Sequence, residues 1–204
     1  APDGGGALSL AQAPGRCGEY RGLTGDILEA CYEIYTGFAD AYVPESDWAD
    51  LKTSLIADGD IDAIPSHPAP KSRLAGWQSE INDIFAGERL GDIYRAMPND
   101  PGPATANAAK LMNRNAPLAM SVATEIIHRV RDGQRIENAL DQEFRYTYRC
   151  VAQGDFIEGI RAAIIDRDRN PAWKHQTWAD VPGSEVLAMT LPLGKDALQW
   201  EKTT

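Results

Sequence analysis

The spacing of apolar residues constrains the fold of this chain more than any other feature. Over most of its 204 residues, apolar side chains recur every three or four positions, the spacing of a helix with one buried face. Leu118, Val122 and Ile126, for example, predict one buried stripe. The exception is the segment 37–44, GFADAYVP, whose aromatic and β-branched residues end at a proline and predict a brief strand. One strand cannot form a sheet by itself, so we expect the chain to be mainly α.

Two clusters of prolines divide the chain. Three prolines fall within residues 65–70 and three more within residues 98–103. Each proline removes a backbone donor and restricts the residue before it, so both clusters predict breaks in regular structure. The tail from residue 175 has weak periodicity, and no element is predicted there. Helices are expected at 74–86, 89–97, 104–114, 115–133 and 135–152.

The charge balance limits the partners of the chain. Its formal net charge is −10, which argues against nucleic acid as a partner because neutralising phosphates requires clustered Lys and Arg. A local basic patch on an acidic protein can still bind a phosphate-bearing ligand. The sequence has no apolar run of about 18 residues, so no membrane partner is expected.

The cysteines and histidines do not form a recognisable metal or redox motif. Cys17, Cys31 and Cys150 are odd in number and lack metal-ligand or redox spacing, so they are expected to be small core residues in a reducing compartment. No two histidines stand at i and i+4, and no metal site is predicted at His67, His128 or His175.

A glycine-rich turn, Asp3-Gly4-Gly5-Gly6, lies near the start of the chain. Its glycines let the backbone approach a ligand closely and leave amides exposed at the start of a helix. Further along the chain come the elements Pro-Gly at 14–15 and Leu-Thr-Gly at 23–25, and then the segment 37–44.

A second pattern covers residues 154–174, GDFIEGIRAAIIDRDRNPAWK. Asp155 and Glu158 have the spacing of a capping box and predict that these two residues cap a helix. Phe156, Ile160 and Ile164 are expected to share one face of that helix.

The order and spacing of these elements resemble the C-terminal part of 3-hydroxyisobutyryl-CoA hydrolases, a thioesterase branch of the enoyl-CoA hydratase/isomerase (crotonase) superfamily. The ending Asp-Arg-Asp-Arg-Asn-Pro-Ala-Trp at 166–173 resembles the hydrolase branch more closely than the plain hydratases. The resemblance implies an α/β crotonase-like (ClpP/crotonase) fold, of which this chain is the mainly helical C-terminal part. Its implied regions are 1–64, the end of the crotonase-like core, 65–114, a linker and helical segment, and 115–204, a C-terminal helical region with a tail.

The resemblance also implies a site around the glycine-rich turn. Asp3 is carried over as the catalytic and substrate-binding residue near the acyl group, with Gly4 and Gly5 as substrate-binding residues and Phe156 closing the acyl pocket. Gly4 stands where the family often has Val. In the family, a partner Glu and two oxyanion-hole amides precede the position of Ala1. The chain is therefore expected to be a fragment, with an apolar surface exposed where the other half packs.

The reaction implied for the intact enzyme is hydrolysis of 3-hydroxyisobutyryl-CoA to 3-hydroxyisobutyrate and CoA, a step of valine breakdown, without metal or redox cofactor. The implied partners are an acyl-CoA and a second copy of the protein bound through the C-terminal helices. The expected location is the cytoplasm, or the mitochondrial matrix in a eukaryote. Two alternatives stay open: enoyl-CoA hydration or isomerisation on the same fold, and a helical assembly module without catalysis.

Overall fold

A computed structural model describes residues 2–26, 29–133 and 135–200. Within these ranges the chain is helical and contains no strand, which confirms the mainly α expectation. The α-helices are α1 (Gly6–Gln12), α2 (Cys17–Thr24), α3 (Ala30–Thr36), α4 (Trp48–Asp58), α5 (Arg73–Ile84), α6 (Leu90–Ala96), α7 (Pro103–Met112), α8 (Pro117–Gly133), α9 (Ile136–Gln153), α10 (Phe156–Ile160) and α11 (Gly183–Thr190). A π-helical turn, Arg161–Ile165, continues α10, and short 3-10 turns lie at Glu45–Asp47, Ile61–Ala63, Trp178–Asp180 and Gly194–Asp196.

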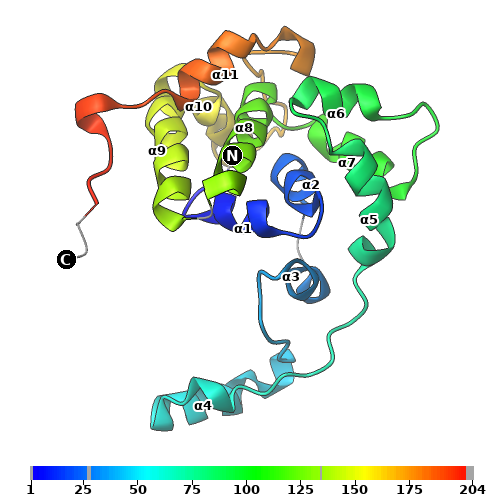
Figure 1. Cartoon of the computed structure of the whole chain (residues 1–204), viewed down its shortest axis with the longest axis vertical. Coiled ribbons are helices and arrows are strands. Elements are labelled where there is room, and N and C mark those ends of the chain that lie inside the picture. Colours follow the sequence, from blue (N-terminus) through cyan, green and yellow to red (C-terminus); the bar gives the residue numbers. More distant parts are fainter. Residues whose placement is uncertain (1, 27–28, 134, 201–204) are drawn as a thin grey trace.

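Helix α8 lies at the centre of the main helical body (Figure 1). It contacts α1, α2, α6, α9 and α11. The predicted stripe of Leu118, Val122 and Ile126 is fully buried against these neighbours, which confirms the periodicity argument. Burial of each such side chain stabilises the fold by roughly 1.5–3 kcal/mol, so α8 anchors much of the structure.

A second cluster of the core joins α2 to α5, α6 and α7. Tyr20 and Phe85 meet there edge to face, with their ring centroids 5.5 Å apart. Residues from all three regions implied by the sequence contribute to this cluster, because Tyr32, Leu74 and Met120 belong to it. The three cysteines are buried and unpaired, as expected from the sequence.

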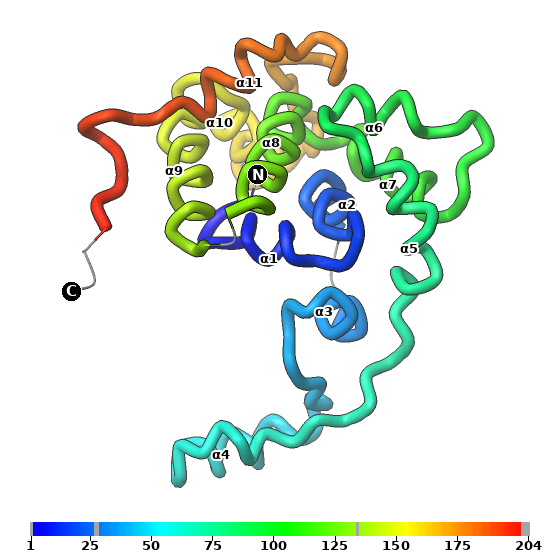
Figure 2. The backbone as a smooth tube through the Cα atoms, viewed as in Figure 1, coloured from blue at the N-terminus to red at the C-terminus, as the bar shows by residue number. Residues whose placement is uncertain are grey.

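The segment from α3 to α5 forms an arm that leaves the main body and returns to it (Figure 2). Helix α4 lies on this arm and has no buried residue. The predicted strand at 37–44 is wrong, since these residues form turns and irregular backbone. A strand needs a neighbour to accept its ladder of hydrogen bonds. Here the segment receives isolated contacts instead, such as His67 N donating to Tyr42 O at 2.9 Å.

No helix in the described part of the chain is both long and apolar enough to cross a bilayer. Several large apolar side chains are nevertheless exposed around α10 and the π-helical turn that follows it. Phe156 is 51% exposed, and Ile157, Ile164 and Ile165 are 56%, 63% and 69% exposed. These four side chains form an exposed apolar surface around α10.

Candidate active site

The Asp3 turn is a tight reversal that only glycine accommodates easily. Gly6 N donates to Asp3 O at 2.8 Å, which closes a four-residue turn. Gly4 has φ +60° and Gly5 has φ +89°, both in the left-handed region. Two successive central residues with positive φ are typical of a type I′ turn. The turn leaves Asp3 and Gly4 exposed to solvent and Gly5 buried.

A carboxylate from α9 holds this turn in place. Glu143 is 3% exposed, and its two oxygens accept the backbone N–H groups of Gly5 and Ala7, both at 2.7 Å. These N–H groups lie at the start of α1, where the first turn of a helix has no intrahelical acceptor. Glu143 therefore satisfies two donors that would otherwise be buried without a partner.

The turn also packs closely against the start of α9 at Gly5. A Cβ atom added to Gly5 would lie 2.4 Å from Cδ1 of Ile136, at the start of α9. The turn consequently packs over the first half of α9. Helix α9 has 18 residues and is about 27 Å long. Phe156 is the first residue of α10, the helix after α9, and its side chain is 51% exposed.

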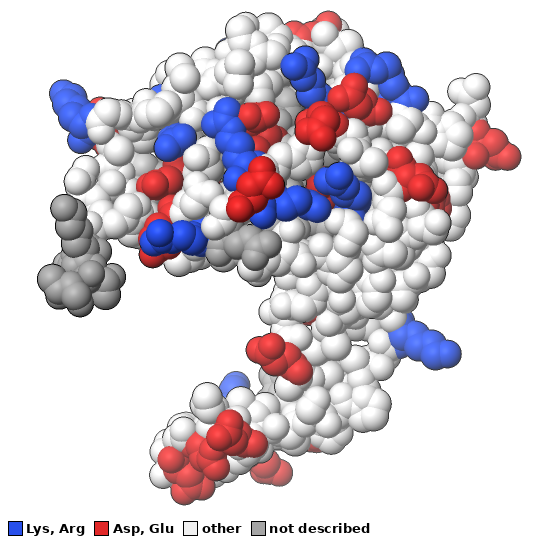
Figure 3. Space-filling view, viewed as in Figure 1, with Lys and Arg blue, Asp and Glu red and all other residues white. Residues whose placement is uncertain are grey.

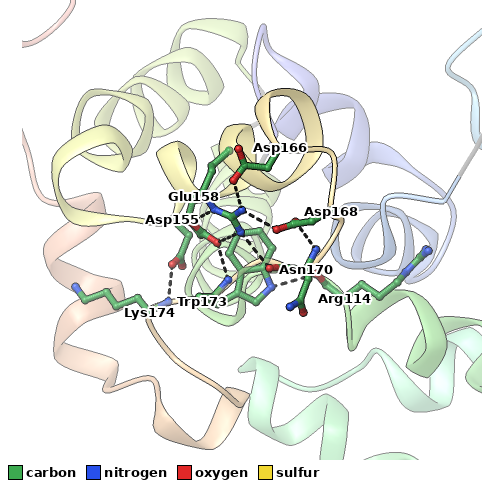
Figure 4. Close-up of polar contacts among 10 residues, drawn as sticks. Arg114, Asp155, Glu158, Asp166, Asp168, Asn170, Trp173 and Lys174 are labelled. Carbon is green, nitrogen blue, oxygen red and sulfur yellow. Dashed lines mark hydrogen bonds and ion pairs between the residues drawn. The ribbon is translucent and has the colours of Figure 1, made fainter.

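The segment 154–174 is organised around Arg161 (Figure 4). Arg161 Nε and Nη2 donate to the two oxygens of Glu158 at 2.9 and 2.8 Å, a bidentate pair. Arg161 Nη1 donates to Asp166 at 2.6 Å and to Asp168 at 2.7 Å, and Nη2 also reaches the carbonyl of Asn170 at 3.1 Å. We refer to Glu158, Arg161, Asp166 and Asp168 as the Arg161 cluster. Arg161 thereby ties α10 to three points of the loop that follows, at residues 166, 168 and 170.

The carboxylates of this segment do not cap α10, so the predicted capping box is wrong. Glu158 accepts instead from Arg161 and from Ala172 N, the latter at 2.6 Å. The hydrogen bonds from Arg161, and then that from Ala172 N, lower the pKa of Glu158 to about 2. Asp155 accepts from Lys174 N at 2.7 Å. Asp155 precedes α10 and Glu158 lies within it, and the loop that returns past this short helix supplies a backbone donor to each.

This segment also attaches to the rest of the body. Trp173 Nε1 donates to Arg114 O at 3.2 Å, just beyond the end of α7 (Figure 4). Lys174 Nζ donates to Glu185 of α11 at 2.5 Å. The loop reverses through Arg167 and Arg169, which have φ +57° and +53°. Non-glycine residues adopt this conformation at a cost, which the Arg161 cluster helps to offset.

The arginines of α8 and α9 are engaged with protein groups. Arg131 pairs with Glu19 and Arg129 with Glu125, while Arg145 donates to the Thr190 carbonyl of α11. On the face drawn in Figure 3, basic and acidic side chains alternate over the main body, and acidic ones gather on the α4 arm. Arg129, Arg131 and Arg145 thus already have partners within the protein. In the described residues, no group of three or more His, Cys, Asp or Glu is placed to hold a metal ion.

The sequence predicts the Asp3 turn from its glycines, but it does not predict that Glu143 holds the turn in place. Glu143 stands on the same face of α9 as Ala139 and Cys150, which are buried. A glutamate at such a position breaks the apolar pattern, and that break is the signal that marks it as functional or structurally special.

Comparison with known proteins places this geometry in a family. The family model described as enoyl-CoA hydratase/isomerase matches residues 1–190, and the chain belongs to this family. Among solved structures, an enoyl-CoA hydratase from Rhodobacter sphaeroides 2.4.1 is 45% identical with a TM-score of 0.91, covering 98% of this chain and 58% of that one. A carnitinyl-CoA dehydratase from Mycobacterium thermoresistibile is 34% identical with a TM-score of 0.89, over the same shares.

The curated relatives carry a different name. The mitochondrial 3-hydroxyisobutyryl-CoA hydrolase of Gallus gallus is 25% identical over 97% of this chain and 54% of its own length. The probable 3-hydroxyisobutyryl-CoA hydrolase 2 of Arabidopsis thaliana is 29% identical over 91% of this chain and 53% of its own length. The chain thus spans about half the length of the curated relatives it matches.

Proposed function

We propose that this chain forms part of an acyl-CoA thioester hydrolase that converts 3-hydroxyisobutyryl-CoA and water to 3-hydroxyisobutyrate and CoA. The observation that carries the proposal is the Asp3 turn, which presents an exposed carboxylate on a backbone fixed by Glu143. The names of the curated relatives support the choice of reaction.

In this reaction, a water oxygen forms a bond to the thioester carbonyl carbon and the carbon–sulfur bond breaks. The water gives up a proton, and the CoA sulfur receives one. We assign Asp3 the role of holding and deprotonating that water, because a carboxylate near the acyl group is a suitable general base. The oxyanion donors that the tetrahedral intermediate needs are assigned by this proposal to the part of the relatives that this chain does not match.

A substrate panel tests the proposal on the protein made from its complete reading frame. Release of free CoA thiol from 3-hydroxyisobutyryl-CoA, at a higher kcat/KM than from acetyl-CoA or butyryl-CoA, is the expected result. A protein that releases no thiol from any of these thioesters is not a hydrolase of this kind.

A second function has an observation of its own in its favour. The solved structure that is 45% identical to this chain is that of an enoyl-CoA hydratase. Hydration of crotonyl-CoA, followed as loss of the absorbance of the conjugated enoyl group, without thiol release, is the outcome that supports this alternative.

A further inference from the structure

Glu143 is a buried carboxylate with an unusual set of partners. It is 3% exposed, and among the described residues it forms no ion pair with Arg, Lys or His. Burying a carboxylate without compensation costs free energy, so its location requires strong hydrogen bonds. The two bonds that it has are both 2.7 Å long and both come from the backbone beside Asp3.

We propose that Glu143 is a positioning residue for the reaction, which fixes the direction in which the Asp3 carboxylate points. The inference rests on the proposed acyl-CoA site and adds a residue to it. Gly5 follows Asp3 by two positions, and the bond from Gly6 N to Asp3 O links them within one turn. A displacement of Gly5 relative to Glu143 therefore moves Asp3 as well.

The geometry of the pair explains why a carboxylate is needed. Gly5 N and Ala7 N approach different oxygens of Glu143, so both oxygens must be acceptors at the same time. Glutamine has one acceptor oxygen, and its NH₂ group would face a backbone N–H. Glu143→Gln therefore keeps the size of the side chain and removes one of the two bonds.

The test uses the protein from its complete reading frame with three variants on α9. Glu143→Gln changes the bonds to the turn, and Cys150→Ala is the matched control. Cys150 is 4% exposed on the same helix, and its Sγ is bonded within α9 to Thr147 O at 3.2 Å. Glu143→Asp is a second variant, which retains the charge but shortens the reach by one methylene. The readouts are amide hydrogen exchange at residues 5 and 7, kcat and KM for acyl-CoA, and the midpoint of urea unfolding.

We expect Glu143→Gln and Glu143→Asp to speed exchange at residues 5 and 7 and to lower kcat about tenfold or more, with KM changed less than kcat. Cys150→Ala should leave both amide exchange at residues 5 and 7 and kcat at their wild-type values, even where its urea midpoint is as low as that of the Glu143 variants. Faster exchange in a protein whose wild type turns over no acyl-CoA would support the contact but refute the proposed function. Unchanged exchange at residues 5 and 7, or a fall in kcat that Cys150→Ala reproduces at equal stability, would overturn the inference.

Discussion

Arg131 on α8 donates to Glu19 on α2 across a distance of 2.7 Å, and the carboxylate of this pair is completely buried. Arg16 Nη1 reaches the same oxygen at 2.8 Å, and His128 Nε2 lies 3.3 Å from it. Burial raises the pKa of Glu19, but His128, Arg16 and Arg131 together outweigh that effect and hold the pKa below its usual range. The network joins helices α2 and α8.

We predict that Arg131→Met lowers the free energy of unfolding by about 2 kcal/mol, because a buried carboxylate loses a charged hydrogen-bond donor. The control is Arg135→Met, since Arg135 is 75% exposed and pairs with Glu137 at the surface. That variant should change the free energy of unfolding by less than about 0.5 kcal/mol. Urea denaturation of both variants measures the difference, and equal losses would refute the importance of the Glu19 network.

The depressed pKa of Glu158 predicts how the loop after α10 responds to acid. A carboxyl group with a lower pKa in the folded state stabilises that state fully above its unfolded pKa, which is 4.5 for Glu, and the contribution disappears as pH falls through about 2. We expect amide exchange in residues 166–174 to be slower in the wild type than in Glu158→Gln at pH 5 to 7. The difference between the two proteins should shrink as the pH falls from 4.5 to 2. A difference that is independent of pH would show that ionised Glu158 does not hold the loop.

The backbone of the Asp3 turn predicts that alanine lowers the stability of the protein by different amounts at Gly4 and at Gly5. Gly4→Ala and Gly5→Ala both place a side chain at positive φ, at a cost of roughly 1–2 kcal/mol each. Gly5→Ala should cost more, because its Cβ would meet Ile136, whereas a Cβ at Gly4 has nothing within 4 Å. Ile136→Ala should therefore recover part of the stability lost in Gly5→Ala and none of that lost in Gly4→Ala. Thermal unfolding of the double-mutant cycle checks this, and equal recovery in both backgrounds would contradict the packing of Gly5 on α9.

The exposed apolar surface around α10 predicts that this chain binds a hydrophobic dye. Ile164 and Ile165 are 63% and 69% exposed, so the double change to serine should reduce the fluorescence of a bound hydrophobic dye. The control is Ile56→Ser on α4, where Ile56 is 86% exposed on a separate arm. Equal reductions from the two changes would show that the surface around α10 is not the main site of dye binding.

Where a helix is long and amphipathic, the sequence predicts both the element and its buried face. Leu118, Val122 and Ile126 illustrate this, because α8 packs on its neighbours through one continuous stripe. Local composition does not reveal whether a partner strand exists, which is why the strand at 37–44 was predicted wrongly. The buried face of α9 includes Glu143, so the apolar pattern does not describe that face completely.

The site shows the same limit. The turn could be predicted from its glycines, because only glycine readily adopts positive φ, as Gly4 and Gly5 do here. The hydrogen bonds that Gly5 N and Ala7 N donate to Glu143 span 138 and 136 positions in the chain, and no local spacing encodes contacts of that range. Local spacing predicts that Asp155 and Glu158 cap a helix, but in the structure they accept from Lys174 N and Ala172 N of the returning loop. Helix α11 was not predicted, because it is short and buries mainly Met189 and Thr190.

The central claim is that Asp3 deprotonates the attacking water, and one measurement tests it directly. CoA release from 3-hydroxyisobutyryl-CoA is followed for the wild-type protein from its complete reading frame, for Asp3→Asn and for Asp40→Asn, an exposed acid outside the turn. The account predicts that Asp3→Asn lowers kcat by about 100-fold or more, while Asp40→Asn retains the wild-type rate. Wild-type turnover in Asp3→Asn would contradict the assignment of the reaction to this turn.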